Sequence, residues 1–249
     1  MTRALNDFFA EIGHFAQMFW DVLRWTPRRP WDFGELLNQM VRVGVLSLPV
    51  VLLTALFTGA VMALQTYGVL ARVNAESFTG SIIALSMVRE LAAVLAAPRR
   101  AGRCGSAMGA ELGTMRVTQQ IDALEVLATN PVHYLVVPRV WATTIVLPLL
   151  VVLSNVVGIY GGYLVSVVLM GANPVSYIDR SFQFMELADV TSGLIKAAVF
   201  GFIIALIGCL KGYRTRGGAK GVGNSTTKAV VAASISVLIV DFFLTKILF

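Results

Sequence analysis

The stretch AGRCGSAMGAELGTMRVTQQIDALEVLATNPVHYLVVPR, residues 101–139, decides how the rest of the chain is organised. It is the only long part that is neither plainly membrane-spanning nor plainly a short connector. Glycines recur every four residues at its start, so they line one stripe of a helix and let another helix approach closely. These glycines are Gly105, Gly109 and Gly113. A polar amphipathic segment follows, and Asn130-Pro131 ends it because proline cannot continue a helix. The pattern predicts a helix at about 115–130 that offers a surface to a soluble partner.

The composition on either side of this stretch is that of a membrane protein. Of the 249 residues, 57% are hydrophobic and 14% are charged, whereas an ordinary globular domain carries about 25% charged residues. Runs of about 20 apolar residues, which are long enough to cross a bilayer, recur along the chain. We therefore predict an all-α polytopic membrane protein.

The apolar pattern divides the chain into an N-terminal helix and a membrane domain. Apolar residues at spacings of three and four between residues 5 and 23 predict an amphipathic helix in the membrane interface, followed by a basic connector that ends at residue 31. The membrane domain, 32–249, has predicted spans at about 43–67, 78–113, 140–170, 190–210 and 229–248. A glycine-rich basic loop is expected at 211–228. Gly158 and Gly162 form a second small-residue stripe, typical of a helix-packing face.

A few charged or polar residues fall inside the predicted spans. Arg89-Glu90 lies at the middle of the second span, where charged residues normally face a cavity or a partner. Two interpretations stay open: a staple that fixes helix register, or a pair beside a pathway for an amphiphile, with Arg89 meeting a phosphate. Gln65 is a candidate buried polar group, and Lys196 is expected to extend to the membrane surface.

The basic residues set the predicted orientation. Most of the 20 lysines and arginines lie in the N-terminal region, in 101–139 or in 211–228. The positive-inside rule puts these segments in the cytoplasm, and five spans then leave the C-terminus outside. The net charge of +6 is explained in this way, so we expect no nucleic-acid partner.

The sequence lacks the common catalytic and nucleotide-binding motifs. A P-loop, HExxH and GxSxG are all missing. We therefore expect no catalytic residue, no metal site and no ATP hydrolysis by this chain. Cys104 and Cys209 have no metal-binding spacing and are predicted to be buried, unreactive thiols.

The polar helix at 115–130 has two interpretations. It has an apolar flank, exposed carboxylates at Asp122 and Glu125 and a proline-terminated exit, which suit a coupling helix that docks on an ATPase. The alternative is a polar helix that simply lies on the membrane surface, and shape alone slightly favours this alternative.

Six segments then resemble the signature of the MlaE/YrbE permease family, and they keep their order over nearly the whole chain. They are Val88-Arg89-Glu90-Leu91, Ala101-Gly102-Arg103, residues 110–118 (AELGTMRVT), residues 120–125 (QIDALE), residues 134–139 (YLVVPR) and residues 241–245 (DFFLT). Two departures from the family pattern are Ala93, where members commonly have proline, and Pro98-Arg99-Arg100, which replaces an apolar triplet. The second departure makes the end of the second span hard to place.

The resemblance implies a permease subunit of an ABC transporter that moves phospholipids between the bacterial inner and outer membranes and maintains outer-membrane lipid asymmetry. It implies a homodimer in the inner membrane, a separate ABC ATPase that binds ATP and Mg, a STAS-domain subunit, and a hexameric MCE-domain protein on the periplasmic face. The implied lipid-path residues are Met62, Gln65, Val69, Leu70, Arg89 and Glu90, and the implied ATPase-coupling residues are Gln120, Asp122, Ala123, Leu124 and Glu125. The alternatives are a self-contained channel and an intramembrane lipid-modifying enzyme. Neither the lipid nor the direction of transport follows from the sequence.

Overall fold

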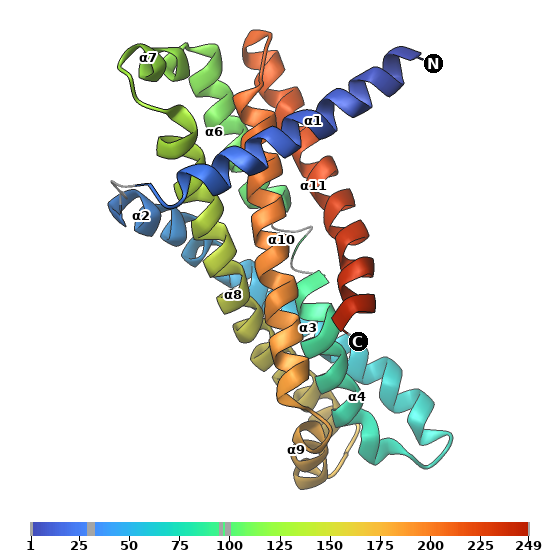
Figure 1. Ribbon diagram of the computed structural model, residues 1–249. Helices are drawn as coiled ribbons and strands as arrows, with labels where there is room; N and C mark the ends of the chain where they lie inside the picture. The colour runs from blue at the N-terminus through green and yellow to red at the C-terminus, as the bar shows by residue number, and fades with distance from the viewer. Residues whose placement is uncertain (1, 29–32, 95–96, 98–100, 249) are drawn as a thin grey trace.

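The computed structural model describes residues 2–28, 33–94, 97 and 101–248, with backbone only for residues 2–8. Within these ranges the chain is helical and contains no strand, as Figure 1 shows. The α-helices are α1 (Thr2–Trp25), α2 (Phe33–Val43), α3 (Leu48–Ala71), α4 (Thr79–Ser86), α6 (Ser106–Val117), α7 (Gln120–Val126), α8 (Val137–Tyr163), α9 (Pro174–Gln183), α10 (Leu187–Tyr213) and α11 (Gly218–Leu248). Wider π-helical turns interrupt or extend them at η3 (Met87–Leu91), η4 (Ala101–Gly105), η5 (Val132–Val136) and η6 (Leu164–Leu169).

Five helical stretches in the described part of the chain are long and apolar enough to cross a membrane. They are Phe33–Ala71, Glu76–Val94, Val132–Leu169, Leu187–Tyr213 and Gly218–Leu248. The predicted class, an all-α polytopic membrane protein, is therefore confirmed. Pro98-Arg99-Arg100, which makes the end of the second span hard to place, lies outside the described residues.

The expected basic loop at 211–228 is wrong in most of its length. α10 continues to Tyr213 and α11 already begins at Gly218, so only residues 214–217 form the turn between them. Gly217 and Gly218 adopt φ values of +91° and +66°, which glycine tolerates and which let the chain reverse sharply. The glycine-rich segment after the turn is helical because it packs on α6, and such tertiary contacts override weak helix propensity.

Glycines let the long helices approach at their backbones. A Cβ on Gly59 of α3 would overlap the carbonyl oxygen of Gly158 in α8. On the other side of the bundle, a Cβ on Gly208 of α10 would lie 3.0 Å from the Gly105 carbonyl oxygen, and one on Gly212 would lie 2.9 Å from that of Gly109. Gly158 of the second stripe thus lies where α3 meets α8, and Gly105 and Gly109 of the first lie against α10, whereas Gly162 faces Tyr177 and Ile83 and Gly113 faces Thr215 and Val222.

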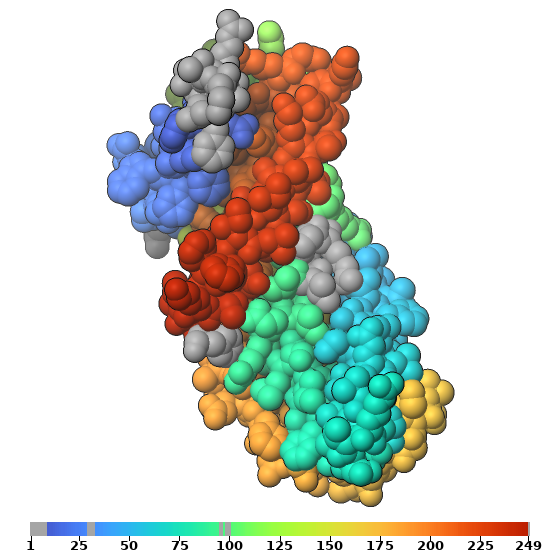
Figure 2. All heavy atoms as spheres, turned by 90° about the vertical axis from the view of Figure 1, so that its right-hand side faces the viewer, coloured from blue at the N-terminus to red at the C-terminus, as the bar shows by residue number. Residues whose placement is uncertain are grey.

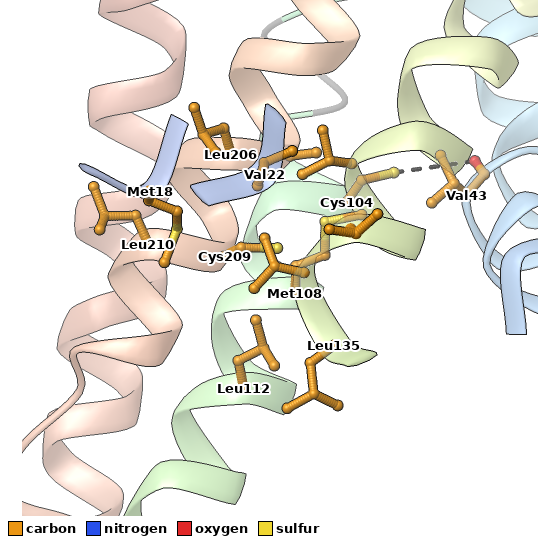
Figure 3. Packing of buried hydrophobic residues seen from close by; sticks show 14 of the residues in the cluster. Met18, Val22, Val43, Cys104, Met108, Leu112, Leu135, Leu206, Cys209 and Leu210 are labelled. Carbon is orange, nitrogen blue, oxygen red and sulfur yellow. Dashed lines mark hydrogen bonds between the residues drawn. The ribbon is translucent and has the colours of Figure 1, made fainter. Parts of the chain in front are cut away.

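The amphipathic α1 crosses the bundle obliquely instead of running along it (Figure 1). It inserts Met18 and Val22 into a core that α6, α8 and α10 share (Figure 3). Cys104 and Cys209 are both buried in this core, which confirms that part of the prediction for them. α1 is therefore attached firmly to one end of the bundle.

The two ends of the bundle differ in charge. One end carries α7 and the 214–217 turn, with α1 close by, and the other carries α4 and α9 (Figure 1). We call the first the basic end, because Arg116, Lys211, Arg214, Arg216 and Lys220 belong to it. The short helix α7 and an excess of basic residues thus lie at the same end of the bundle.

Candidate functional site

A cluster of ionised side chains joins three of the apolar helices. Lys196 of α10 has no exposed surface, and its Nζ lies 2.5 Å from Glu90 Oε1 and 3.8 Å from Asp241 Oδ1. It also donates to Thr245 Oγ1 at 2.8 Å, and this hydroxyl has two acceptors in reach, the Asp241 carbonyl oxygen at 2.9 Å and Glu90 Oε1 at 3.2 Å. We call these four residues the charge cluster. It ties η3 to α10 and α11.

The prediction that Lys196 extends to the membrane surface is wrong. Lys196 lies nine residues after the start of α10 at Leu187, which places it roughly 13 Å inside the helix end. Carboxylates from two neighbouring helices meet it there, so pairing replaces exposure to water. A buried ammonium is tolerated when it is paired and hydrogen-bonded in this way.

Arg89 and Glu90 contact the same neighbouring helix but different partners. Arg89 Nε lies 2.6 Å from Oδ1 of Asp189, a residue that is only 2% exposed. The other oxygen of Asp189 accepts the backbone N–H of Glu186 at 3.1 Å and caps α10. The Arg89–Asp189 ion pair thus joins η3 to the first turn of α10, as expected of a contact that fixes helix register. The side chains of Arg89 and Glu90 nevertheless stay 43% and 35% exposed, so both keep surface for another ligand.

A shallow apolar groove runs along α3 beside this cluster. Its volume is about 410 Å³, and its lining includes Phe57, Val61 and Met62 of α3 together with Leu91, the residue after Glu90. The structure thus brings one of the predicted lipid-path residues of α3, Met62, next to the turn that carries Arg89 and Glu90. The groove is open to the outside of the chain, as expected if another surface completes it.

The other predicted lipid-path residues of α3 lie outside this groove. Val69 is exposed and Leu70 is half-buried, and neither lines the groove. Gln65 is exposed, so its prediction as a buried polar group is wrong. The buried face of α3 carries Ala63, and a residue two positions further along points about 200° away from that face.

The short helix α7 is fixed to the basic end by one apolar anchor and two polar contacts. Ile121 has no exposed surface and belongs to the core beneath α7. Asp122 forms an ion pair with Arg116 of α6, and Tyr213 of α10 donates a hydrogen bond to Glu125 at 3.2 Å. Left-handed residues flank the helix, Gln119 at φ +59° and Ala128 at φ +57°, so the chain turns sharply on both sides. These contacts hold α7 as a short projecting element.

The surface that α7 presents outward is apolar at its C-terminal end. Val126 is 86% exposed and Leu127 is 73% exposed, although both are large hydrophobic residues. Of the predicted coupling residues, Gln120, Asp122, Ala123 and Glu125 are exposed and Leu124 is half-buried. Asp122 and Glu125 bind side chains of this chain, so the outermost residues of the helix end are the apolar pair.

A second group of ion pairs surrounds Glu111, near the middle of α6. The guanidinium of Arg139 is only 3% exposed and lies 3.1 Å from Glu111 Oε1, and Arg42 reaches the same oxygen at 3.5 Å. Arg139 also donates to the carbonyl oxygen of Leu135 at 2.6 Å. Glu111 thus links α2, α6 and α8 below the projecting helix.

Sequence reasoning missed several members of these sites. Asp189 falls between the predicted spans at 140–170 and 190–210. Asp241 lies inside the predicted span at 229–248 but was given no partner, and Val126 and Leu127 belong to the predicted apolar flank of the polar helix. One signal was available. The predicted spans hold charges of both signs, and such charges normally pair with one another inside a bundle.

Comparisons with known proteins agree on one family. The profile of the family described as "Permease MlaE" matches residues 36–247. A probable ABC transporter permease protein of Rickettsia typhi is 45% identical over 97% of this chain and 93% of its own length. A probable ABC transporter permease protein of Synechocystis is 47% identical over 86% of this chain and 81% of its own length.

One relative has a more specific description. The intermembrane phospholipid transport system permease protein MlaE of Haemophilus influenzae is 38% identical over 100% of this chain and 96% of its own length. The fold and these matches agree: the chain is a multi-pass membrane permease, not an enzyme, and it belongs to the MlaE permease family.

Proposed function

We propose that the chain is the membrane subunit of an ATP-driven transporter that moves phospholipids between the inner and outer membranes and so maintains outer-membrane lipid asymmetry. The description of the Haemophilus influenzae relative supports the phospholipid substrate. The groove on α3 supports it further, because an acyl chain gains about 0.8 kcal/mol for each CH₂ that it keeps from water.

The single observation that carries the proposal is the exposed apolar end of an anchored α7. Val126 and Leu127 protrude from a helix that Ile121 holds in the core. Exposed apolar side chains at the end of a rigid element are suited to fill a pocket on a partner. We assign that partner as a separate ABC ATPase, which supplies the ATP and Mg chemistry that the motifs of this chain do not provide.

The proposed transport step uses α7 as a handle. Closure of the ATPase pair would push on α7, and the push would reach α6 through the Arg116–Asp122 ion pair and α10 through Tyr213. α10 carries Lys196 and so connects this movement to the charge cluster beside the lipid groove. A phosphate group could there meet the exposed part of Arg89.

The family resemblance supports a larger assembly, and the open groove on α3 supports a second copy of the chain within it. We propose a homodimer in the bacterial inner membrane, so that two α3 grooves enclose one lipid pocket. The basic end would face the cytoplasm, by the positive-inside rule, and the C-terminus the periplasm. A STAS-domain subunit would bind the ATPase, and a hexameric MCE-domain protein would continue the apolar path on the periplasmic side.

The test replaces the apolar pair of α7 by charge. The double variant Val126→Asp/Leu127→Asp should keep the fold, because both side chains are exposed, and should lose ATPase binding and ATP-driven lipid transfer. Charge reversal of Asp122 is a poorer test, because it also breaks the contact with Arg116.

A matched control puts the same change at the opposite end. Val175 and Leu187 are 66% and 85% exposed, near the starts of α9 and α10. Val175→Asp/Leu187→Asp should bind the ATPase as the unmodified chain does. Normal ATPase binding by the α7 variant, or equal loss in both variants, would overturn the coupling assignment.

A further inference from the structure

A second groove lies at the basic end, between α1, α10 and α11. Its volume is about 420 Å³, and none of its lining residues also lines the groove on α3. Figure 2 shows α1 and α11 side by side on this face of the molecule. The groove is therefore a separate site from the proposed transport path.

The groove carries an excess of positive charge. Lys211, Arg214 and Lys228 line it, and Glu11 is the one carboxylate among its lining residues. Lys211 Nζ lies 2.5 Å from Glu11 Oε1, and the lysine side chain is only 17% exposed. Arg214 and Lys228 are both exposed, so a bound anion can reach them. His14 of α1 is half-buried at the same groove.

The polarity of the groove changes in the same direction on both long helices. α10 contributes Ile207 first and then Lys211 and Arg214 as it approaches the basic end. α11 runs back from that end and contributes Ser225 and Lys228 first, and then Ala232 and Ser236. Because the two helices are antiparallel neighbours, their apolar residues lie together and their cations lie together. All the cations of the groove thus lie in its outer half, and the inner half is lined mainly by apolar side chains, with the hydroxyl of Ser236 at its end.

We propose that this groove binds one anionic glycerophospholipid of the leaflet at the basic end, as a resident lipid distinct from the lipid in transit. The phosphodiester would lie between Arg214 and Lys228, with Lys211 behind them, and an acyl chain would follow Ile207, Phe15 and Ala232. Basic pockets between membrane helices hold anionic headgroups by this combination of charge and depth. A free anion would use only the cationic half and leave the apolar half unfilled.

The experiment is a lipid titration of the purified full chain by native mass spectrometry, with no ATP and no ATPase. The probes are dioleoylphosphatidylglycerol, dioleoylphosphatidylcholine and inorganic phosphate. We expect tighter binding of the anionic lipid than of the zwitterionic one. Arg214→Ser/Lys228→Ser should weaken the anionic lipid by about 30-fold, as expected for two lost cations near a membrane surface.

Two further variants keep the test decisive. Arg216→Ser/Lys220→Ser removes the same charge from exposed positions outside the groove and should change the affinity by less than about threefold. Ala232→Phe keeps every cation but fills the apolar half, so it should abolish binding of the lipid. It tests the groove independently if Arg214→Ser/Lys228→Ser does not fold.

Three results would overturn the proposal. They are equal affinity for the two lipids, equal loss in the control variant, and displacement of the lipid by inorganic phosphate, which would make the groove a site for free anions. The titration measures lipid binding and not lipid transport. A chain that binds the anionic lipid but transports no lipid would therefore contradict the proposed function and leave this inference intact.

Discussion

Replacement of Lys196 by methionine tests the charge cluster most severely. Methionine has a similar length and fills the space, but it removes the ammonium that Glu90, Asp241 and Thr245 share. The variant therefore leaves two partly buried carboxylates between the helices without this cation. We expect a loss of stability that comes from uncompensated charge and not from a cavity.

The structure limits the size of this loss. Removal of one partner from a buried ion pair typically costs about 3–5 kcal/mol. Glu90 is still 35% exposed and can recover some hydration, so we expect the lower end of that range, about 3 kcal/mol. Lys246→Met, at an exposed position of the same charge on α11, should change the free energy of unfolding by less than about 0.5 kcal/mol.

The assay is an SDS titration of the protein in mixed micelles, with helicity followed by circular dichroism. A triple variant, Lys196→Met/Glu90→Gln/Asp241→Asn, removes all three charges and should recover most of the lost stability, because a neutral replacement of a buried ion group is often tolerated. The reasoning is refuted if Lys196→Met unfolds like the unmodified protein. It is refuted equally if the triple variant is no more stable than the single one.

Three other predictions follow from the packing. Ile121→Ala removes the buried anchor of α7 and should cost about 2–5 kcal/mol locally, so amide hydrogen exchange in α7 should accelerate; unchanged exchange would show that α7 is held by other contacts. In Gly158→Leu the new Cβ would overlap the Met87 methyl group and lie 3.3 Å from the Ala55 carbonyl oxygen, so the rest of the leucine has no room between α3 and α8 and should abolish the monodisperse peak in size-exclusion chromatography, whereas Gly68→Ala meets nothing within 4 Å and should elute normally. Burial raises the pKa of Tyr177 above its ordinary value of 10.0, so the folded state favours the neutral phenol and loses stability as the pH rises above about 10. Tyr177→Phe should make that alkaline loss smaller, and it should cost about 1 kcal/mol at neutral pH because the hydrogen bond to the Ile159 carbonyl oxygen is gone; an identical alkaline slope in both proteins would contradict this.

The number and type of membrane helices could be predicted from the sequence, because composition and the length of apolar runs depend only on local residues. The projecting helix could be placed only roughly. The expected helix at about 115–130 is broken at Thr118 and Gln119 and ends at Val126, four residues before the predicted stop at Asn130-Pro131. Asn130 instead accepts hydrogen bonds from the N–H groups of Val132 and His133 and so caps the next helix. The fate of Lys196 could not be predicted. Whether a lysine extends to water or pairs inside depends on Glu90 and Asp241, which approach it only after three helices pack.

The same distinction explains the other differences. Residues 218–228 have a loop-like composition, and only their packing on α6 makes them helical. Gln65 is exposed because the buried stripe of α3 runs through Gly59 and Ala63 instead. In each case the local pattern allowed two outcomes, and contacts between distant segments selected one.

The central claim is that this permease moves lipid only when a separate ATPase grips α7. The most direct measurement is transfer of a fluorescent phospholipid from proteoliposomes that contain the chain with its ATPase, with and without ATP. We predict transfer that requires ATP, stops with a hydrolysis-deficient ATPase, and is lost in Val126→Asp/Leu127→Asp. Equal transfer by the chain alone, without nucleotide, would contradict the account and indicate a self-contained channel.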